Sequence, residues 1–187
     1  MKKNIPGTNM VYTDSNDAFS VFRPLIDITG GLSLGQICSI TGLQSSTIQN
    51  WVKRGYVQRP VNKKYSERHL ARILLISALR DCMNIEQIGE LMILINGDTE
   101  DDSDDIVSET RLYDIFCKTI SNLDTQMFTD LQIEEVIKKQ LKNESHQDEL
   151  MYALKIMVYA YISGICFKQI KVNQNSLKQL KGYKDEE

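Results

Sequence analysis

The sequence predicts a mainly α-helical protein in which an N-terminal winged helix-turn-helix is followed by a C-terminal helical bundle. Two short apolar stripes at helical spacing, separated by a glycine turn, predict the helix-turn-helix between residues 32 and 55. A segment that mixes β-forming and strand-breaking residues follows, and it predicts the wing. Helical stretches after a later acidic run predict the bundle.

The second helix of the helix-turn-helix is predicted just before Gly55, which ends it as a left-handed glycine. Its apolar side faces a core, and its polar side is open. Ser45 or Ser46 is the expected N-cap, because a serine hydroxyl can accept a hydrogen bond from the first helical turn. The apolar stripe, at i, i+3 and i+4, consists of Ile48, Trp51 and Val52.

The segment from residue 56 to residue 65 is predicted to form either a short two-stranded wing or an extended loop. Its β-forming residues are interrupted by Pro60 and Asn62, which break strands. Ser66 then caps one helix and Asn84 caps a second. The helix-turn-helix, the wing and these two helices make up a predicted DNA-binding domain over residues 32–97.

The remainder of the chain is divided into three predicted segments. Residues 1–31 form a loose polar arm and an apolar packing segment, and residues 98–105 form a solvated acidic linker. Residues 106–187 form a helical dimerisation or effector domain, with helices expected at 106–123, 128–141 and 149–172. The last of these helices is apolar nearly all round, so we expect a second subunit to cover it in a homodimer.

Charge is distributed unevenly along a chain whose net charge is −3. Between residues 45 and 72 there are seven cations against Glu67 alone, a net of +6, which leaves −9 for the remainder. This asymmetry indicates a basic patch that faces an anionic partner, and a solvated basic face is the alternative. The seven cations are Lys53, Arg54, Arg59, Lys63, Lys64, Arg68 and Arg72.

No pattern of catalytic residues occurs in the sequence, and we expect no enzymatic activity. There is no glycine-rich phosphate loop and no nucleophile elbow, and the two histidines have no ligand-spaced neighbours. The acidic run lacks the central glycine and terminal glutamate of a calcium-binding EF-hand. Four widely spaced cysteines predict buried, reduced thiols, so we expect neither a metal nor an organic cofactor.

Cytoplasmic localisation without a membrane partner is expected. The first residues lack the apolar core of a signal peptide. The most apolar run, Ile156 to Phe167, is too short to span a bilayer and is bracketed by Lys155 and Lys168.

Several motifs resemble the DNA-binding domain of MerR-like transcriptional regulators, in which a helix-turn-helix and a wing are followed by two helices. The resemblance covers about a third of the chain. Two runs, Trp51–Tyr56 and Pro60–Leu70, more closely resemble an uncharacterised bacterial family of MerR-like proteins, known only as a domain of unknown function. The motifs are Leu34-Gly35-Gln36-Ile37, Thr41-Gly42-Leu43, Thr47-Ile48-Gln49-Asn50-Trp51, Gly55-Tyr56 and Lys64-Tyr65-Ser66.

The chain also departs from the MerR-like pattern. These regulators usually carry an arginine followed by two aromatic residues in the second helix, where this chain has Gln49, Asn50 and Trp51. The family's phosphate contact from the first aromatic is therefore not expected here. The long dimerising helix of the family does not follow directly, because the acidic linker intervenes, and the cysteine pattern of its metal sensors is absent.

The sequence predicts a bacterial transcription regulator that binds duplex DNA as a dimer, through bases in the major groove and phosphates beside it. The alternative is a non-enzymatic protein-interaction adaptor that keeps the winged fold and binds a partner through its C-terminal helices. The operator, any small-molecule effector and the sign of regulation are not predicted. The residues expected to contact DNA are Ser46, Thr47, Gln49, Asn50, Lys53, Arg54, Lys63, Lys64 and Tyr65.

Overall fold

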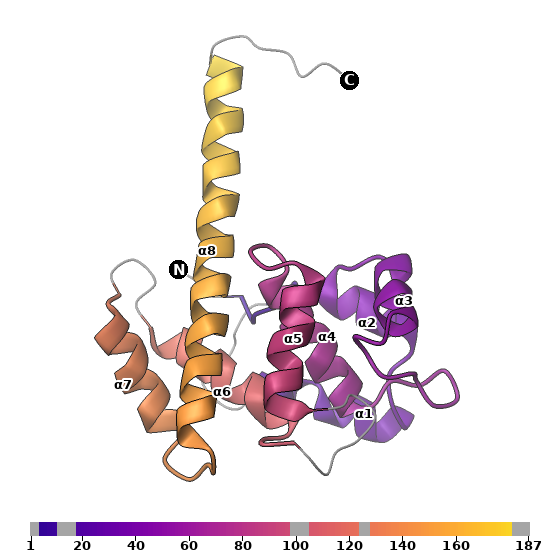
Figure 1. The fold of residues 1–187 in the computed structure, drawn as a ribbon. Helices are drawn as coiled ribbons and strands as arrows, with labels where there is room; N and C mark the ends of the chain where they lie inside the picture. The colour runs from indigo at the N-terminus through magenta and orange to yellow at the C-terminus, as the bar shows by residue number, and fades with distance from the viewer. Residues whose placement is uncertain (1–3, 11–17, 98–104, 124–127, 181–187) are drawn as a thin grey trace.

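The computed structural model describes residues 4–10, 18–97, 105–123 and 128–180. Within these ranges the chain forms eight α-helices and a short 3₁₀ helix, η1 (Ala18–Val21), and no β-strand. The predicted mainly α-helical class is therefore confirmed (Figure 1). The helices are α1 (Arg23–Thr29), α2 (Leu34–Thr41), α3 (Ser45–Lys53), α4 (Glu67–Leu79), α5 (Ile85–Asn96), α6 (Glu109–Asn122), α7 (Asp130–Gln140) and α8 (Gln147–Leu180).

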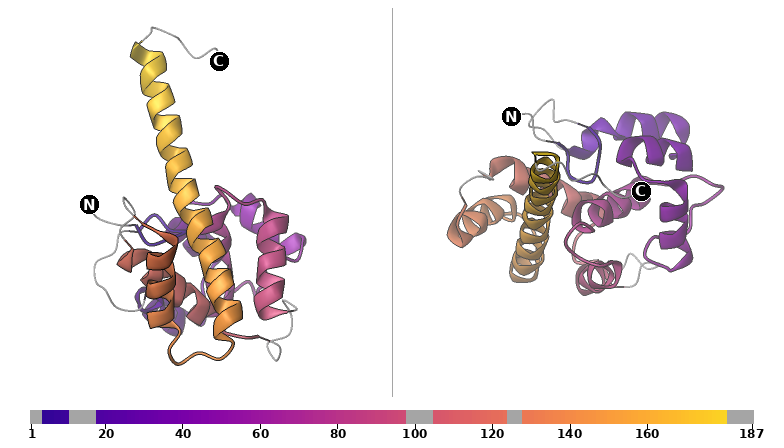
Figure 2. Two further views of the ribbon diagram at one scale, coloured as in Figure 1. Left: turned by 60° about the vertical axis from the view of Figure 1, so that its left-hand side comes forward. Right: turned by 90° about the horizontal axis from the view of Figure 1, so that it is seen from above.

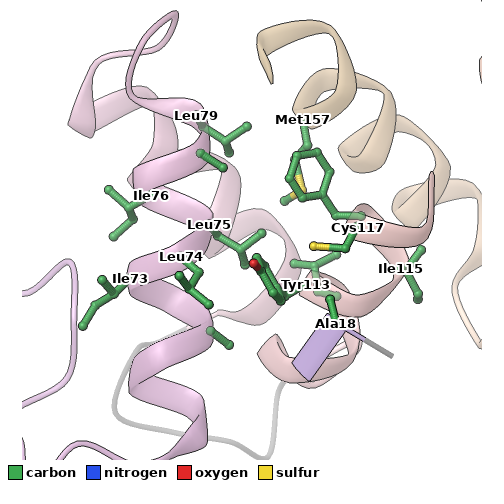
Figure 3. Close-up of a cluster of buried hydrophobic side chains, with 14 of the residues drawn as sticks. Ala18, Ile73, Leu74, Leu75, Ile76, Leu79, Tyr113, Ile115, Cys117 and Met157 are labelled. Atoms are coloured by element: carbon green, nitrogen blue, oxygen red, sulfur yellow. The ribbon is translucent and has the colours of Figure 1, made fainter. Parts of the chain in front are cut away.

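Helix α4 lies at the centre of the fold, and almost all of its side chains are buried. Leu75 and Leu79 face α6 and α8, where they approach Tyr113 and Met157 (Figure 3). Ile76 points to the other side of α4 (Figure 3). A helix whose side chains are buried on nearly every side needs neighbouring elements on each of those sides. Helix α4 therefore packs against α2, α5, α6 and α8, and it joins the helix-turn-helix to the C-terminal helices through one core.

A cluster of buried charges joins α4 to the start of α6. Arg72 Nη1 lies 3.0 Å from Glu109 Oε1, and both side chains are almost inaccessible to solvent. Burial raises the pKa of the Glu109 carboxyl and lowers the pKa of the Arg72 guanidinium, while the charge of each favours ionisation of the other. Arg68 lies 3.7 Å from Glu109 and 3.5 Å from Asp105. Asp105 is therefore not part of a solvated linker, and residues 98–104 of the predicted linker lie outside the described residues.

Residues 4–10 pack against α4 and α6 instead of forming part of the predicted loose arm. Ile5 is buried, and the Tyr113 hydroxyl donates a hydrogen bond of 2.7 Å to the carbonyl of Pro6. Gly7 has a left-handed φ of 77°, and a Cβ at this position would overlap the carbonyl oxygen of Leu74. Glycine permits both the backbone conformation and the close approach to α4. The loose arm was predicted to extend to Ser20, but residues 18–20 belong to η1, in which Ala18 and Phe19 are buried. Residues 1–3 and 11–17 lie outside the described residues.

Helix α8 packs against α4, α5, α6 and α7 through its first half and then projects from the body of the protein (Figures 1 and 2). From Ile165 onward its described side chains are exposed. The sequence predicted a polar tail from Asn173, whereas the helix continues to Leu180. The buried residues of its first half are Leu150, Ala153, Leu154, Met157, Val158, Ala160 and Ile162.

Helix α8 extends well beyond the apolar run of residues 156–167, so the expectation that this segment is too short to span a bilayer is wrong. By length and composition alone, Gln147–Leu177 is sufficient to cross a bilayer, with a mean hydropathy of 1.6 in its most apolar 18-residue window. In this structure 44% of that window is buried against other helices. A core helix of a soluble helical bundle can have the same length and apolar composition, because its apolar side chains pack in the core.

The four cysteines are free, as predicted, but their burial differs from the prediction. Cys117 is buried in the core and Cys38 is partly buried, whereas Cys82 and Cys166 are exposed. Cys166 is exposed because it lies where α8 has already left the bundle.

Candidate nucleic-acid interface

Helices α2 and α3 form the predicted helix-turn-helix. Ser33 starts α2 with a capping box, in which its N–H donates to Gln36 Oε1 at 2.7 Å and its hydroxyl accepts from the Gln36 N–H. Gly42 ends α2 with a left-handed φ of 72° and so turns the chain toward α3. Helix α3 begins at Ser45, with Gln44 at the N-cap and no side-chain cap hydrogen bond. The predicted serine cap is therefore wrong, although the helix start is nearly correct.

The two sides of α3 differ as predicted. Ile48 and Trp51 are buried and hold the helix against the core, and Val52 is partly buried. The opposite side is exposed and carries side chains that can donate and accept hydrogen bonds. Its members, at i, i+3, i+4 and i+7, are Ser46, Gln49, Asn50 and Lys53.

Residues 56–65 form an irregular loop in place of a two-stranded wing. Asn62 and Lys63 have left-handed φ angles of 51° and 60° in the turn at its tip. Pro60 has no backbone N–H to donate to a strand ladder. The alternative of an extended loop is therefore correct, and the two-stranded wing is not shown. In the described chain the loop takes part in two isolated bridges, Val61–Lys64 and Leu32–Tyr65.

Two side chains of α4 hold this loop in place. His69 Nδ1 accepts a hydrogen bond of 3.0 Å from the Ser66 N–H, so in the neutral ring Nε2 carries the proton and donates to the Arg59 carbonyl at 3.2 Å. Arg72 Nε donates to the Tyr56 carbonyl at 3.1 Å. The position of the loop beside α3 is therefore set by the core helix.

The basic patch contains fewer unpaired cations than the sequence predicted. Arg68 and Arg72 belong to the buried charge cluster, so they are withdrawn from the surface. The Arg54 guanidinium lies 2.6 Å from Glu86 of α5 and stacks over the Tyr56 ring. Three exposed cations of the patch make no ion pair with any other described residue, and these are Lys53, Arg59 and Lys63.

The structure gathers some, but not all, of the residues expected to contact DNA. Thr47 is only partly exposed, and Arg54 is engaged with α5. Lys64 Nζ donates to the Gly31 carbonyl at 3.3 Å. Tyr65 is 4% exposed, and burial raises the pKa of its hydroxyl. The residues that remain on the exposed surface of α3 and the loop are Ser46, Gln49, Asn50, Lys53 and Lys63.

A cavity of about 440 Å³ lies between α3, the start of α2 and the 56–65 loop. The sequence analysis did not identify it, because its walls come from three separate segments and no local pattern marks such a space. Of its lining residues, the two lysines, Gln49 and Tyr65 were expected from the sequence to contact DNA. The cavity is lined by Leu34, Gln49, Val52, Lys53, Pro60, Lys63 and Tyr65.

Within the described ranges, no group of three or more histidine, cysteine, aspartate or glutamate side chains is placed to hold a metal ion. The exposed surface of α3 and the loop offers amides, a hydroxyl and ammonium groups. These groups can recognise base edges and phosphates.

Residues 32–116 match the model of a family described as a domain of unknown function (DUF1836). The predicted relation to an uncharacterised family is thus supported, whereas nothing in the match supports a relation to MerR-like regulators. The matched segment begins at the predicted start of the DNA-binding domain and continues into α6, beyond the predicted end of that domain.

The chain is also similar to the uncharacterized protein YkrK of Bacillus subtilis (strain 168), with 27% identity over 125 residues. The similarity covers 63% of this chain, and the chain spans about half (54%) of the length of that relative. No solved structure matches the chain.

Proposed function

We propose that the protein is a DNA-binding transcriptional regulator that places α3 in the major groove of duplex DNA. The observation that carries the proposal is the exposed side of α3, where Ser46, Gln49, Asn50 and Lys53 share one surface with Lys63 of the adjoining loop. The MerR-like motifs of the sequence point in the same direction.

This surface carries both kinds of side chain that DNA recognition needs, those that contact bases and those that contact phosphates. Gln49 and Asn50 carry the amide groups that can bond the N6 and N7 edge of adenine in a bidentate manner. Lys53, Arg59 and Lys63 are exposed cations without an ion pair in the described chain, so they are available to neutralise phosphates. An α-helix fits the width of the major groove. With α3 in the groove, the amides of Gln49 and Asn50 would face the bases, and the exposed cations would face the phosphate backbone.

Lysine removal is expected to weaken binding to every duplex, whatever its sequence. A plot of log affinity against log salt has a negative slope. For Lys53→Ala and for Lys63→Ala, the magnitude of this slope should fall by about one, because each variant leaves one phosphate unneutralised. Fluorescence anisotropy with a labelled random-sequence duplex over a salt series measures this slope. Lys171→Ala, an exposed lysine on the projecting part of α8, is the matched control and should leave the slope unchanged. Equal slopes for all four proteins would place the DNA contact elsewhere.

Removal of the Asn50 amide is expected to change sequence preference rather than overall affinity. Asn50→Ala should relax discrimination at one or two base positions by about 1–3 kcal/mol, the worth of a bidentate base contact. Binding to a panel of single-base variants of a selected site measures this directly. Asn175→Ala, at an exposed asparagine of α8, provides the control. If the Asn50 variant keeps the preferences of the wild type, Asn50 does not read a base.

We further propose that the protein binds DNA as a homodimer paired through α8. One stripe of α8 lies opposite its buried side at intervals of four and three residues, the spacing of a coiled-coil seam, with the polar residues Ser163 and Asn173 at two of its eight positions. The exposed fractions of its large apolar side chains run from 39% at Tyr159, whose hydroxyl donates to Asp130 of α7, to 70% at Tyr152, and soluble monomers rarely expose a continuous apolar stripe. Its apolar members are Tyr152, Ile156, Tyr159, Cys166, Ile170 and Leu177.

A two-fold pair of this kind also meets a requirement of DNA binding. A single helix-turn-helix contacts few base pairs, whereas a dimer contacts two half-sites and gains the affinity of both. The exposed stripe thus supports the dimer independently of the surface of α3.

A further inference from the structure

The cavity between α3, α2 and the 56–65 loop combines an apolar interior with cations. Leu34, Val52 and Pro60 supply apolar wall, and the Tyr65 ring adds an aromatic surface. Its volume of about 440 Å³ lies in the range of small-molecule sites.

The charged residues that line the cavity are both cations. Lys53 comes from α3 and Lys63 from the tip of the loop, so two lysine side chains from different segments line the same space. Neither makes an ion pair with a described residue, and no carboxylate lines the cavity. The Tyr65 side chain also lines the cavity, and burial raises the pKa of its hydroxyl, so it adds no negative charge.

We propose that this cavity binds a small organic carboxylate with an apolar body. The carboxylate would pair with Lys53 and Lys63, and the body would lie against Leu34, Val52 and Pro60. Phosphates of DNA would satisfy the two lysines but would leave the apolar walls uncovered. A ligand that carries both parts fits the whole cavity, and charge-assisted hydrogen bonds then fix its orientation.

The position of the cavity makes such a ligand a competitor of DNA. Gln49, Lys53 and Lys63 would serve both the ligand and the duplex, so that the two cannot occupy the surface together. Only the competition with DNA rests on the proposed function. Binding of the carboxylate does not depend on it and can be measured on the free protein.

The test uses 2-naphthoate as the probe and its neutral analogue 2-naphthamide as the matched ligand. Isothermal titration calorimetry of the full chain with 2-naphthoate should give a Kd of about 1 mM or lower. The amide should bind about tenfold more weakly or worse, because it cannot form charge-assisted contacts with the lysines. The double variant Lys53→Gln, Lys63→Gln should lose a similar factor for 2-naphthoate, whereas Lys171→Gln on α8 should bind like the wild type.

Three results would overturn the site: no binding of 2-naphthoate up to its solubility, equal binding of acid and amide, or equal loss in the Lys171→Gln control. An NMR titration with 2-naphthoate would also overturn the site if the shifted backbone amide resonances mapped to α8 instead of α3 and the loop. A second measurement adds saturating 2-naphthoate to the protein–duplex complex, and it should raise the apparent Kd for DNA. A protein that binds 2-naphthoate but no duplex would refute the proposed function and leave the carboxylate site standing.

Discussion

Glu109→Ala is expected to lower the free energy of unfolding by about 3–5 kcal/mol, because it removes one partner of a buried ion pair and leaves the other charge without compensation. The Glu109 and Arg72 side chains are 1% and 4% exposed, so water cannot replace the lost carboxylate at the guanidinium. The loss would also loosen α6 from α4, since this pair connects the start of one helix to the middle of the other. Urea unfolding followed by circular dichroism measures the change.

The control for this variant is Lys168→Ala, which breaks the exposed pair between Lys168 Nζ and Asp81 Oδ2 at 2.6 Å. Exposed ion pairs contribute little, so the expected change is below about 1 kcal/mol. If Glu109→Ala is as mild as Lys168→Ala, the Arg72 guanidinium must reach water or another acid, and the buried cluster does not connect the two helices.

Ile170→Glu is expected to convert a homodimer at micromolar concentration into a monomer, with a rise in the dimer dissociation constant of about a hundredfold or more. Pairing through the α8 stripe would place an unpaired carboxylate of each subunit in an apolar seam. Ile170 is 51% exposed on the projecting part of α8, so the substitution leaves the core intact and helical content should not change. Sedimentation equilibrium gives the mass of each species.

Asn175→Glu introduces the same charge on the opposite side of α8 and should leave the dimer unchanged. A wild-type chain that sediments as a monomer would contradict the dimer and favour the adaptor alternative. Since α8 also has the length and composition to cross a bilayer, flotation with lipid vesicles accompanies this measurement. Co-flotation of the wild type would assign the stripe to a membrane instead of a second subunit.

The helices that form from local signals were predicted well. The cap of α4 at Ser66 and that of α5 at Asn84 were predicted from residue type and spacing alone, and the structure has both. The ends of α2 and α3 follow from Gly42 and Gly55, which both have the left-handed φ that glycine tolerates. These signals lie within a few residues of the features that they determine.

Features that depend on distant partners were not predicted. The position of Ile5 against the core follows from contacts of residues 4–10 with α4 and α6, and the adjacent residues in the sequence do not predict these contacts. The extent of α8 was underestimated because its last turns have mixed polarity and expose their side chains. The wing was expected from β-forming residues, yet a left-handed turn and a proline leave only isolated bridges.

The candidate site was predicted in part for the same reason. Helical periodicity correctly placed Ser46, Gln49, Asn50 and Lys53 on the open side of α3. Charge counting was less reliable, because Arg68 and Arg72 have buried acidic partners that a linear tally of charge cannot locate. The cavity beside α3 was missed altogether, since three segments must fold before it exists.

Selection of genomic fragments by the purified full-length chain tests the central claim most directly. The protein is incubated with sheared duplex DNA at physiological salt, and the bound fraction is sequenced. We expect enrichment of fragments that share two inverted half-sites, with centres about one helical turn, or a multiple of it, apart. A bound fraction with the same sequence content as the input, recovered from protein of native helical content, would contradict the claim that this chain is a sequence-specific DNA-binding regulator.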